Sequence, residues 1–271
     1  MTTGPATGPA PATGAGPAAG RPPAAPGRSW LRQSAPSADT RLRLFCLPFA
    51  GGGASAYHCW QAELPPEVEL LPVHLPGRGT RLREPAADDV DALAADLLDG
   101  VRDWLRPPYA WYGHSMGAAL AHRVVAATAR RGLPAPELLA VAARRAPHLP
   151  PEPPLHHTLP RPELIERLRV LGATPEAVLA DPRLLDTVLT TVRADFRMVE
   201  LAPLAPVVAP LDVPVVAFGG SADPLVGLAD LRAWHLHTTR PLRTHVLAGG
   251  HFFHLDRPGR LVRLLSKEIG L

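Results

Sequence analysis

Short apolar runs alternate along the chain with longer segments whose apolar residues recur at helical spacing. The runs with strand character cover residues 42–47, 68–75, 109–112, 138–142, 213–218 and 244–247. Between them, residues 90–105, 116–131 and 228–237 place their apolar side chains on one helical face. Alternation of this kind predicts an α/β protein whose mostly parallel sheet is covered by helices on both faces.

One stretch interrupts the alternation. Residues 147–154 are rich in proline, and helical patterns then occupy residues 162–171, 175–179 and 182–201 with no strand between them. Proline suits the first position of a helix, which agrees with these starts. The three patterns carry more apolar residues than an exposed helix needs. We therefore predict an inserted helical lid over about residues 148–202, part of which covers a cleft.

The N-terminal region has a different composition from the rest. Most of the first 28 residues are Pro, Ala or Gly, with neither strand nor helix periodicity. The region lacks the charged and apolar blocks of a secretory signal or transit peptide. We expect residues 1–38 to be a disordered tail and residues 39–271 to form one domain.

Composition narrows the functional classes. The chain is 46% apolar and 20% charged, which allows a large core, and no apolar run is long enough to cross a bilayer. Its 28 basic and 25 acidic residues leave a formal charge of +3, too small to indicate nucleic-acid binding. Two cysteines make neither a disulfide framework nor a zinc-ligand set. We expect a cytoplasmic protein.

The strongest chemical signal is Gly113-His114-Ser115-Met116-Gly117, which follows a predicted strand and precedes a predicted helix. This is the G-x-S-x-G nucleophile elbow in its proper context, a sharp turn that holds a serine hydroxyl above the sheet. A chance Gly-Ser turn is the alternative. The context favours Ser115 as a nucleophile.

A serine needs a histidine base to attack near neutral pH. His251 follows Gly249-Gly250 directly after the last predicted strand, so it lies at the same sheet edge as the elbow. His254 shares this loop and is the second candidate. We expect His251 to be the base.

The base needs a carboxylate to orient it, and the usual chain order in this fold is serine, acid, histidine. Asp223 follows the strand at residues 213–218 and precedes His251 by one helix and one strand. Other aspartates are less well placed, because they precede that strand, lie in the next helix or lie in the lid: Asp212, Asp230 and Asp195. Asp223 is therefore the predicted acid.

Two backbone amides are needed to hold the oxyanion. One belongs to the residue after the nucleophile, Met116. The other comes from the glycine-rich segment that follows the first strand, where Ala50 is the best candidate. A phosphate-binding loop is a weaker interpretation, since the Lys-Ser/Thr of a P-loop and the G-x-G-x-x-G spacing are both missing.

Together these residues resemble a known family, the type II thioesterases that accompany polyketide synthases and nonribosomal peptide synthetases. The resemblance runs from about residue 42 to 265. It rests on Leu47-Pro48-Phe49-Ala50-Gly51-Gly52, Leu75-Pro76-Gly77-Arg78-Gly79, the elbow, Arg144-Arg145-Ala146-Pro147, Ala194-Asp195-Phe196, residues 219–224 and Gly249-Gly250-His251-Phe252-Phe253. It implies an α/β-hydrolase fold and a serine thioesterase with Ser115 as nucleophile, His251 as base, Asp223 as acid and Ala50 and Met116 as oxyanion donors.

The resemblance also implies a substrate and a partner. The substrate would be an acyl group held as a thioester on the phosphopantetheine arm of an acyl or peptidyl carrier protein. The enzyme would remove stalled or mis-primed groups, would need no cofactor of its own and no metal, and would act as a monomer that binds neither nucleic acid nor membrane. A lipase or carboxylesterase, an acyltransferase and a non-catalytic hydrolase-like binding protein remain alternatives.

Five arginines lie in or near predicted loops. They are Arg78, Arg81, Arg83, Arg144 and Arg145, all in loops that we expect near the cleft mouth. An ordinary solvated surface explains any single one. As a group they could steer an acidic carrier protein towards the cleft.

Overall fold

The computed structural model describes Met1 and residues 29–32, 40–207 and 209–271. Its centre is one six-stranded sheet in the order β2-β1-β3-β4-β5-β6, and every neighbouring pair is parallel. The strands are β1 (Leu42–Leu47), β2 (Val68–Pro72), β3 (Tyr109–His114), β4 (Leu138–Ala142), β5 (Val215–Gly220) and β6 (Arg243–Leu247). The predicted α/β architecture with a parallel sheet is confirmed.

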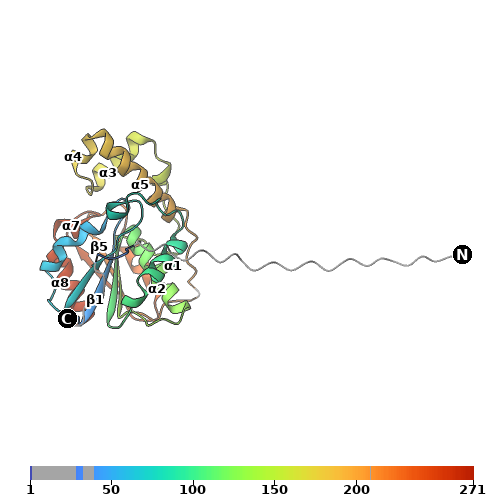
Figure 1. Ribbon diagram of the computed structural model, residues 1–271, viewed down its shortest axis with the longest axis vertical. Coiled ribbons are helices and arrows are strands. Elements are labelled where there is room, and N and C mark those ends of the chain that lie inside the picture. Colours follow the sequence, from blue (N-terminus) through green and yellow to red (C-terminus); the bar gives the residue numbers. More distant parts are fainter. Residues whose placement is uncertain (2–28, 33–39, 208) are drawn as a thin grey trace.

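Helices cover both faces of this sheet, so the central strands are apolar on both sides. On one face lie α1 (Val90–Gly100) and α2 (Met116–Arg130), with α6 (Leu228–Arg232) and the 3-10 helix η5 (Ala233–His237). On the other lie the 3-10 helix η1 (Ala54–Ala62), α7 (Phe253–Asp256) and α8 (Pro258–Ile269). Figure 1 shows α1 and α2 on one side of the sheet and α7 and α8 on the other. Two buried apolar layers result, one against each face.

Several segments differ from the predicted elements, and three of the differences concern helices that cover the sheet. The pattern at residues 90–105 is α-helical only to Gly100, and a 3-10 helix (Arg102–Trp104) follows it. The pattern at 228–237 divides into α6 and η5. Helix α8 was not predicted; it has a narrow buried stripe and is followed by Gly270, whose φ is 85°. Glycine in the left-handed conformation commonly ends an α-helix, so Gly270 was a sequence signal for the end of α8.

The inserted helices form a separate small layer above the carboxyl edge of the sheet (Figure 1). They are the 3-10 helix η4 (His156–Thr158), α3 (Arg161–Leu171), α4 (Glu176–Ala180) and α5 (Pro182–Glu200). Leu164, Leu168, Leu185 and Leu189 are among the residues of a buried apolar cluster that lies within this layer. The predicted lid thus has its own core, which explains its surplus of apolar residues.

The N-terminal boundary of the domain needs a correction. Trp30 and Leu31, which the sequence analysis assigned to the tail, are buried in the core on the α1 face. The Trp30 carbonyl accepts a hydrogen bond from the His74 amide at 2.8 Å, and the Arg81 guanidinium stacks 4.1 Å from the indole centre. A Cβ at Gly100 would lie 2.0 Å from the indole, so a glycine leaves the space that Trp30 fills. Residues 2–28 and 33–39 of the predicted tail lie outside the described residues.

Candidate active site

The elbow holds Ser115 in a strained conformation between β3 and α2. Its backbone has φ of 53° and ψ of −112°, and its amide donates to the Ala142 carbonyl at 2.8 Å. A non-glycine residue in this region costs about 1–3 kcal/mol, which the surrounding structure must compensate. A Cβ at Gly113 would lie 2.2 Å from the Gly117 carbonyl oxygen, and one at Gly117 would lie 2.1 Å from the Leu47 carbonyl oxygen. Both glycines are therefore required by close backbone packing.

A chain of hydrogen bonds connects Ser115 to the predicted base and acid. The Ser115 Oγ lies 3.1 Å from His251 Nε2, and His251 Nδ1 lies 2.9 Å from Asp223 Oδ2. The other Asp223 oxygen accepts from the Leu225 amide at 2.8 Å. The carboxylate favours a proton on Nδ1, which leaves Nε2 free to accept the serine proton. The three side chains come from loops after β3, β5 and β6, whose carboxyl ends share one sheet edge.

The competing candidates lie elsewhere. His254 is fully buried and stacks on His114 at 3.8 Å between ring centres, and neither of its ring nitrogens has a hydrogen-bond partner among the described residues. The three other aspartates each pair with an arginine: Asp195 with Arg78, Asp212 with Arg240 and Asp230 with Arg145. The structure brings together the three residues that the sequence analysis selected.

His114 contacts the backbone of the predicted base, His251, and this contact was not predicted from the sequence. Its Nε2 lies 2.9 Å from the His251 carbonyl oxygen, and the Tyr112 hydroxyl lies 3.2 Å from its Nδ1. Burial, together with the nearby His254 and His251, lowers the pKa of His114 well below its usual value. A neutral ring that donates from Nε2 and accepts at Nδ1 fits these partners, so His114 helps to fix the backbone of His251. Its position inside G-x-S-x-G was the only local signal.

The glycine-rich segment after β1 lines a cavity beside Ser115. Ala50 lines a cavity together with Ser115, and Met116 is the first residue of α2, where a helical amide has no acceptor within the helix. Their role as oxyanion donors stays a prediction. The Gly51 amide, next to Ala50, donates to Asp195 Oδ2 of α5 at 2.8 Å. This hydrogen bond connects the candidate oxyanion loop, which contains Ala50 and Gly51, to the lid.

A buried ion pair strengthens this tie. Arg78 NH1 and NH2 donate to the two Asp195 oxygens at 2.5 and 2.7 Å, and NH1 also lies 3.4 Å from the Gly52 carbonyl oxygen. Their side chains are only 9% and 1% exposed. A Cβ at Gly51, whose φ is 76°, would lie 2.3 Å from a Val192 methyl of α5. Helix α5 therefore packs directly against the loop.

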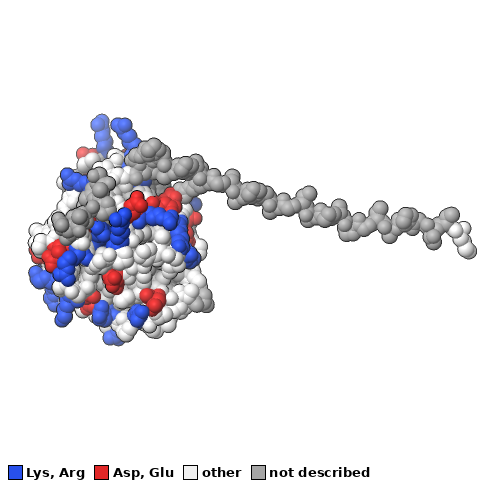
Figure 2. All heavy atoms as spheres, turned by 60° about the horizontal axis from the view of Figure 1, so that its bottom comes forward, with Lys and Arg blue, Asp and Glu red and all other residues white. Residues whose placement is uncertain are grey.

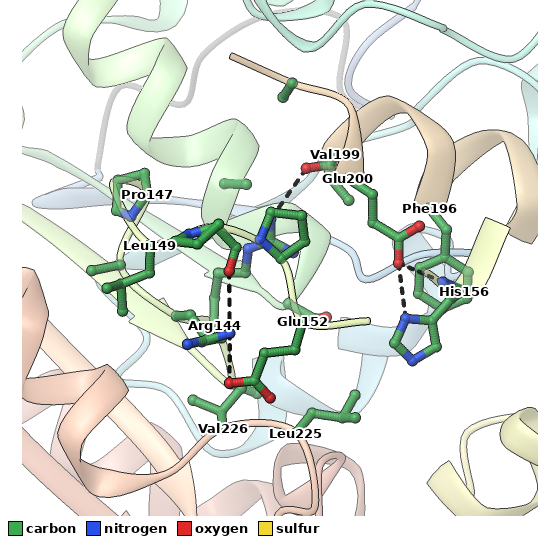
Figure 3. A pocket seen from close by; sticks show the side chains of 18 of the residues that line it. Arg144, Pro147, Leu149, Glu152, His156, Phe196, Val199, Glu200, Leu225 and Val226 are labelled. Atoms are coloured by element: carbon green, nitrogen blue, oxygen red, sulfur yellow. Dashed lines mark hydrogen bonds and ion pairs between the residues drawn. The ribbon is translucent and has the colours of Figure 1, made fainter. Parts of the chain in front are cut away.

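Two cavities meet at Ser115 and His251. One, of about 330 Å³, is mainly apolar and lies between the oxyanion loop and the lid, with Leu168, Val188 and Val192 in its wall. The other, of about 310 Å³, carries more polar side chains, including Arg144, Glu152 and Glu200, as Figure 3 shows. A reacting group on the serine can therefore extend in two chemically different directions.

The predicted group of arginines near the cleft mouth is wrong for two of its five members, Arg78 and Arg81. Arg78 and Arg81 are buried and paired with carboxylates, Arg144 lines the polar cavity, and Arg145 is paired with Asp230 and Glu152. Arg83 alone of the five is exposed. On the face seen in Figure 2, basic and acidic side chains are interspersed. The sequence showed positions in loops, but could not show that these loops fold inward.

Comparison with known proteins identifies the family. Residues 42–269 match the thioesterase domain. The chain belongs to this thioesterase family. The thioesterase is 37% identical to the thioesterase PikA5 of Streptomyces venezuelae over 84% of this chain and 81% of that protein. It is 31% identical to the gramicidin S biosynthesis protein GrsT of Aneurinibacillus migulanus over 89% and 94%. The resemblance to type II thioesterases is confirmed.

Solved structures agree in fold. The thioesterase RedJ of the prodiginine pathway in Streptomyces coelicolor is 39% identical, with a TM-score of 0.79 over 89% of this chain and 93% of that one. The type II thioesterase BorB of the borrelidin cluster is 36% identical, with a TM-score of 0.80 over 89% and 98%. The α/β-hydrolase fold is confirmed, and the protein is a serine thioesterase, an enzyme that hydrolyses thioesters.

Proposed function

We propose that the thioesterase removes acyl groups from the phosphopantetheine arm of acyl or peptidyl carrier proteins, and so clears stalled or mis-primed groups from a polyketide or nonribosomal peptide synthase. The relatives support this proposal, since their names place them in gramicidin S and prodiginine biosynthesis. The observation that carries it is the hydrogen-bonded chain of Ser115, His251 and Asp223 beside two cavities. That arrangement can accommodate an acyl chain and a long thiol arm at the same time.

The first half of the proposed reaction forms an acyl-enzyme. His251 Nε2 takes the proton of Ser115 as the serine oxygen attacks the thioester carbon, and Asp223 stabilises the imidazolium that forms. The Ala50 and Met116 amides hold the oxyanion. The carbon-sulfur bond then breaks, and His251 returns its proton to the departing thiolate.

The second half hydrolyses that ester. A water molecule gives a proton to His251 and attacks the acyl carbon, the oxyanion forms again on the same amides, and the Ser115 oxygen leaves with the proton. The products are a free acid and the carrier thiol. The reaction uses side chains, backbone amides and water, so we expect a chelator to leave turnover unchanged.

The test is hydrolysis of acyl groups on carrier proteins and on N-acetylcysteamine. Replacing Ser115 or His251 by alanine should reduce kcat by about 10³-fold or more, and the double variant should be little worse, since the residues act as a unit. Asp223→Asn should cost about 10²- to 10⁴-fold, because the ring loses its orienting anion. Asp212→Asn is the matched control, an exposed aspartate paired with Arg240 and remote from the serine.

Other outcomes would favour the alternatives. A protein that cleaves carboxylic esters much faster than thioesters is an esterase, and one that passes the acyl group to an alcohol or amine in preference to water is an acyltransferase. Asp195→Asn that abolishes turnover in a folded protein, with Asp223→Asn nearly silent, would show that the acid is misassigned.

We also expect the enzyme to work as a monomer in the cytoplasm, next to the synthase that it serves. No helix in the described part of the chain is long and apolar enough to cross a membrane. Gel filtration and fractionation of the producing cells test these expectations.

A further inference from the structure

Arg144 is a partly exposed cation that lines the cavity beside Ser115 and has few partners among the described residues. It follows β4 after Ala143, whose φ is 50°, and its carbonyl accepts from Trp234 Nε1 at 2.8 Å, which fixes its backbone. Its guanidinium donates to the Val199 carbonyl at 3.4 Å, a long contact drawn in Figure 3. Among the described residues no carboxylate lies within ion-pair distance of it. Most of its donors therefore have no acceptor in the part of the chain that the structure describes.

The neighbouring arginine shows the usual arrangement. Arg145 Nε lies 2.9 Å from Asp230 Oδ1, and its NH1 lies 2.8 Å from Glu152 Oε1. Within the described residues Arg144 has no such carboxylate partners, so its donors that face the cavity can bind water or the polar atoms of a ligand. Burial lowers the pKa of Arg144 to about 10, which still leaves it charged at neutral pH. Its free donors are available to a ligand.

The position of the side chain tells which part of a ligand it meets. Arg144 lines the cavity that also contains Ser115 and His251 and that extends to exposed residues, among them Pro151 and Leu204. A long group that enters from the surface and ends at the serine passes along this wall. The second cavity, which is mainly apolar, remains for an alkyl chain.

The wall of this cavity contains charges of both signs. Glu152 and Glu200 line it together with Arg123, Arg145 and Arg167 as well as Arg144. Glu200 accepts from the amides and Nδ1 atoms of His156 and His157. Burial alone would raise the pKa of Glu200, but these hydrogen bonds lower it to about 2, so it stays ionised. An amide carbonyl can accept from Arg144 without bringing a further negative charge next to Glu200.

We propose that Arg144 binds an amide carbonyl of the pantetheine arm and thereby selects thioesters whose thiol carries such amides. The proposal rests on the proposed function and assigns the polar cavity to the arm. Arg144 then contributes to recognition of the leaving thiol, and the acyl group is selected elsewhere.

The experiment uses one acyl group on three thiols: pantetheine, N-acetylcysteamine and a straight-chain alkanethiol without amides. kcat/KM is measured for wild type, Arg144→Met, Arg144→Lys and the control Arg83→Met, an exposed arginine outside both cavities. The ratio of wild type to variant is compared between thiols, so that differences in leaving-group pKa cancel. Loss of a charge-assisted hydrogen bond should lower kcat/KM of Arg144→Met for pantetheine about ten- to hundredfold.

For the alkanethiol thioester, Arg144→Met should lose less than about threefold in kcat/KM. For the pantetheine thioester, Arg144→Lys should recover part of the lost kcat/KM, and Arg83→Met should not change it. An equal loss on all three thiols, or no loss on any, overturns the proposal. A loss of kcat/KM that Arg144→Met shows with the malonyl thioester of pantetheine but not with the propionyl thioester also overturns the proposal. Arg144 would then bind the acyl group. If Arg144→Met does not fold, Arg144→Gln takes its place.

The same experiment distinguishes failure of the proposed function from failure of the inference about Arg144. If the proposed function fails, wild-type protein does not hydrolyse the pantetheine thioester, or Ser115→Ala hydrolyses it equally well. The inference about Arg144 fails by itself when wild type is active and depends on Ser115, but the ratios do not differ between thiols.

Discussion

Replacing Asp195 by alanine should both destabilise the protein and impair the oxyanion loop. The carboxylate accepts from Arg78 at 2.5 and 2.7 Å and from the Gly51 amide at 2.8 Å, and it is 1% exposed. Removing one partner of a buried ion pair leaves an uncompensated charge and typically costs about 3–5 kcal/mol. In a protein of this size such a loss lowers Tm by roughly 10 °C.

The effect of Asp195→Ala on turnover arises from the candidate oxyanion loop, whose Gly51 amide donates to Asp195. Without Asp195, the Gly51 amide loses its acceptor, and the adjacent Ala50 amide is no longer held against α5. Complete loss of one oxyanion donor costs about 10²- to 10³-fold in kcat, so a misaligned donor should cost at least about tenfold. KM should change much less, because the donor acts mainly on the transition state.

A double variant separates stability from positioning. Arg78→Met with Asp195→Leu removes both charges and leaves no buried ion unpaired, so much of the lost Tm should return. The Gly51 amide still has no carboxylate acceptor, so kcat should stay low. Thermal unfolding followed by circular dichroism gives Tm, and turnover of an acyl-N-acetylcysteamine thioester well below Tm gives kcat.

Two results would refute this reasoning. One is an Asp195→Ala variant with wild-type Tm and kcat, which would mean that the pair contributes nothing. The other is a double variant that recovers kcat together with Tm, because the loop would then depend on general stability and not on the Asp195 carboxylate.

Three further predictions concern the N-terminal contact, acid stability and the lid. Trp30→Ala should lower the free energy of unfolding by about 3 kcal/mol, seen as a lower urea midpoint, while removal of residues 2–28 should leave it unchanged; an equal loss from the deletion would contradict the boundary. Burial lowers the pKa of His254 and of His122 to about 3, and that of His237 to about 4. These rings bind protons more readily when unfolded, so stability should fall as pH drops from about 6.5 towards 3. His254→Phe should make that fall shallower in urea titrations, and an unchanged slope would show that the ring is not held neutral. In hydrogen exchange, α3 and α4 should open before α5, which is tied to the core through Asp195; equal protection of all three would show that the lid is fixed throughout.

Much of the fold and the candidate triad could be predicted because their signals are local. Buried parallel strands are apolar throughout, and the carboxyl ends of such strands meet at one edge, so loops after β3, β5 and β6 had to converge. Ser115, Asp223 and His251 follow from that rule together with the elbow. The lid was predictable for a similar reason, since three helices without a strand between them cannot belong to the alternating layers.

The remaining contacts depend on residues far apart in the chain. Arg78 and Asp195 are separated by 117 positions, and no pattern around either one indicates its partner. Trp30 follows a segment rich in Pro, Ala and Gly, and its burial depends on Gly100, His74 and Arg81, which are distant in the sequence. Arg78 and Arg81 are buried although they lie in loops, because a loop position in the sequence does not tell which way the loop folds.

The most direct measurement is the mass of the enzyme quenched during turnover of an acylated carrier protein, followed by mapping of the modified peptide. The account predicts a transient acyl adduct on Ser115, no adduct in Ser115→Ala, and a carrier protein that stays loaded with that variant. An adduct on another residue, or unloading of the carrier by Ser115→Ala at the wild-type rate, would contradict it.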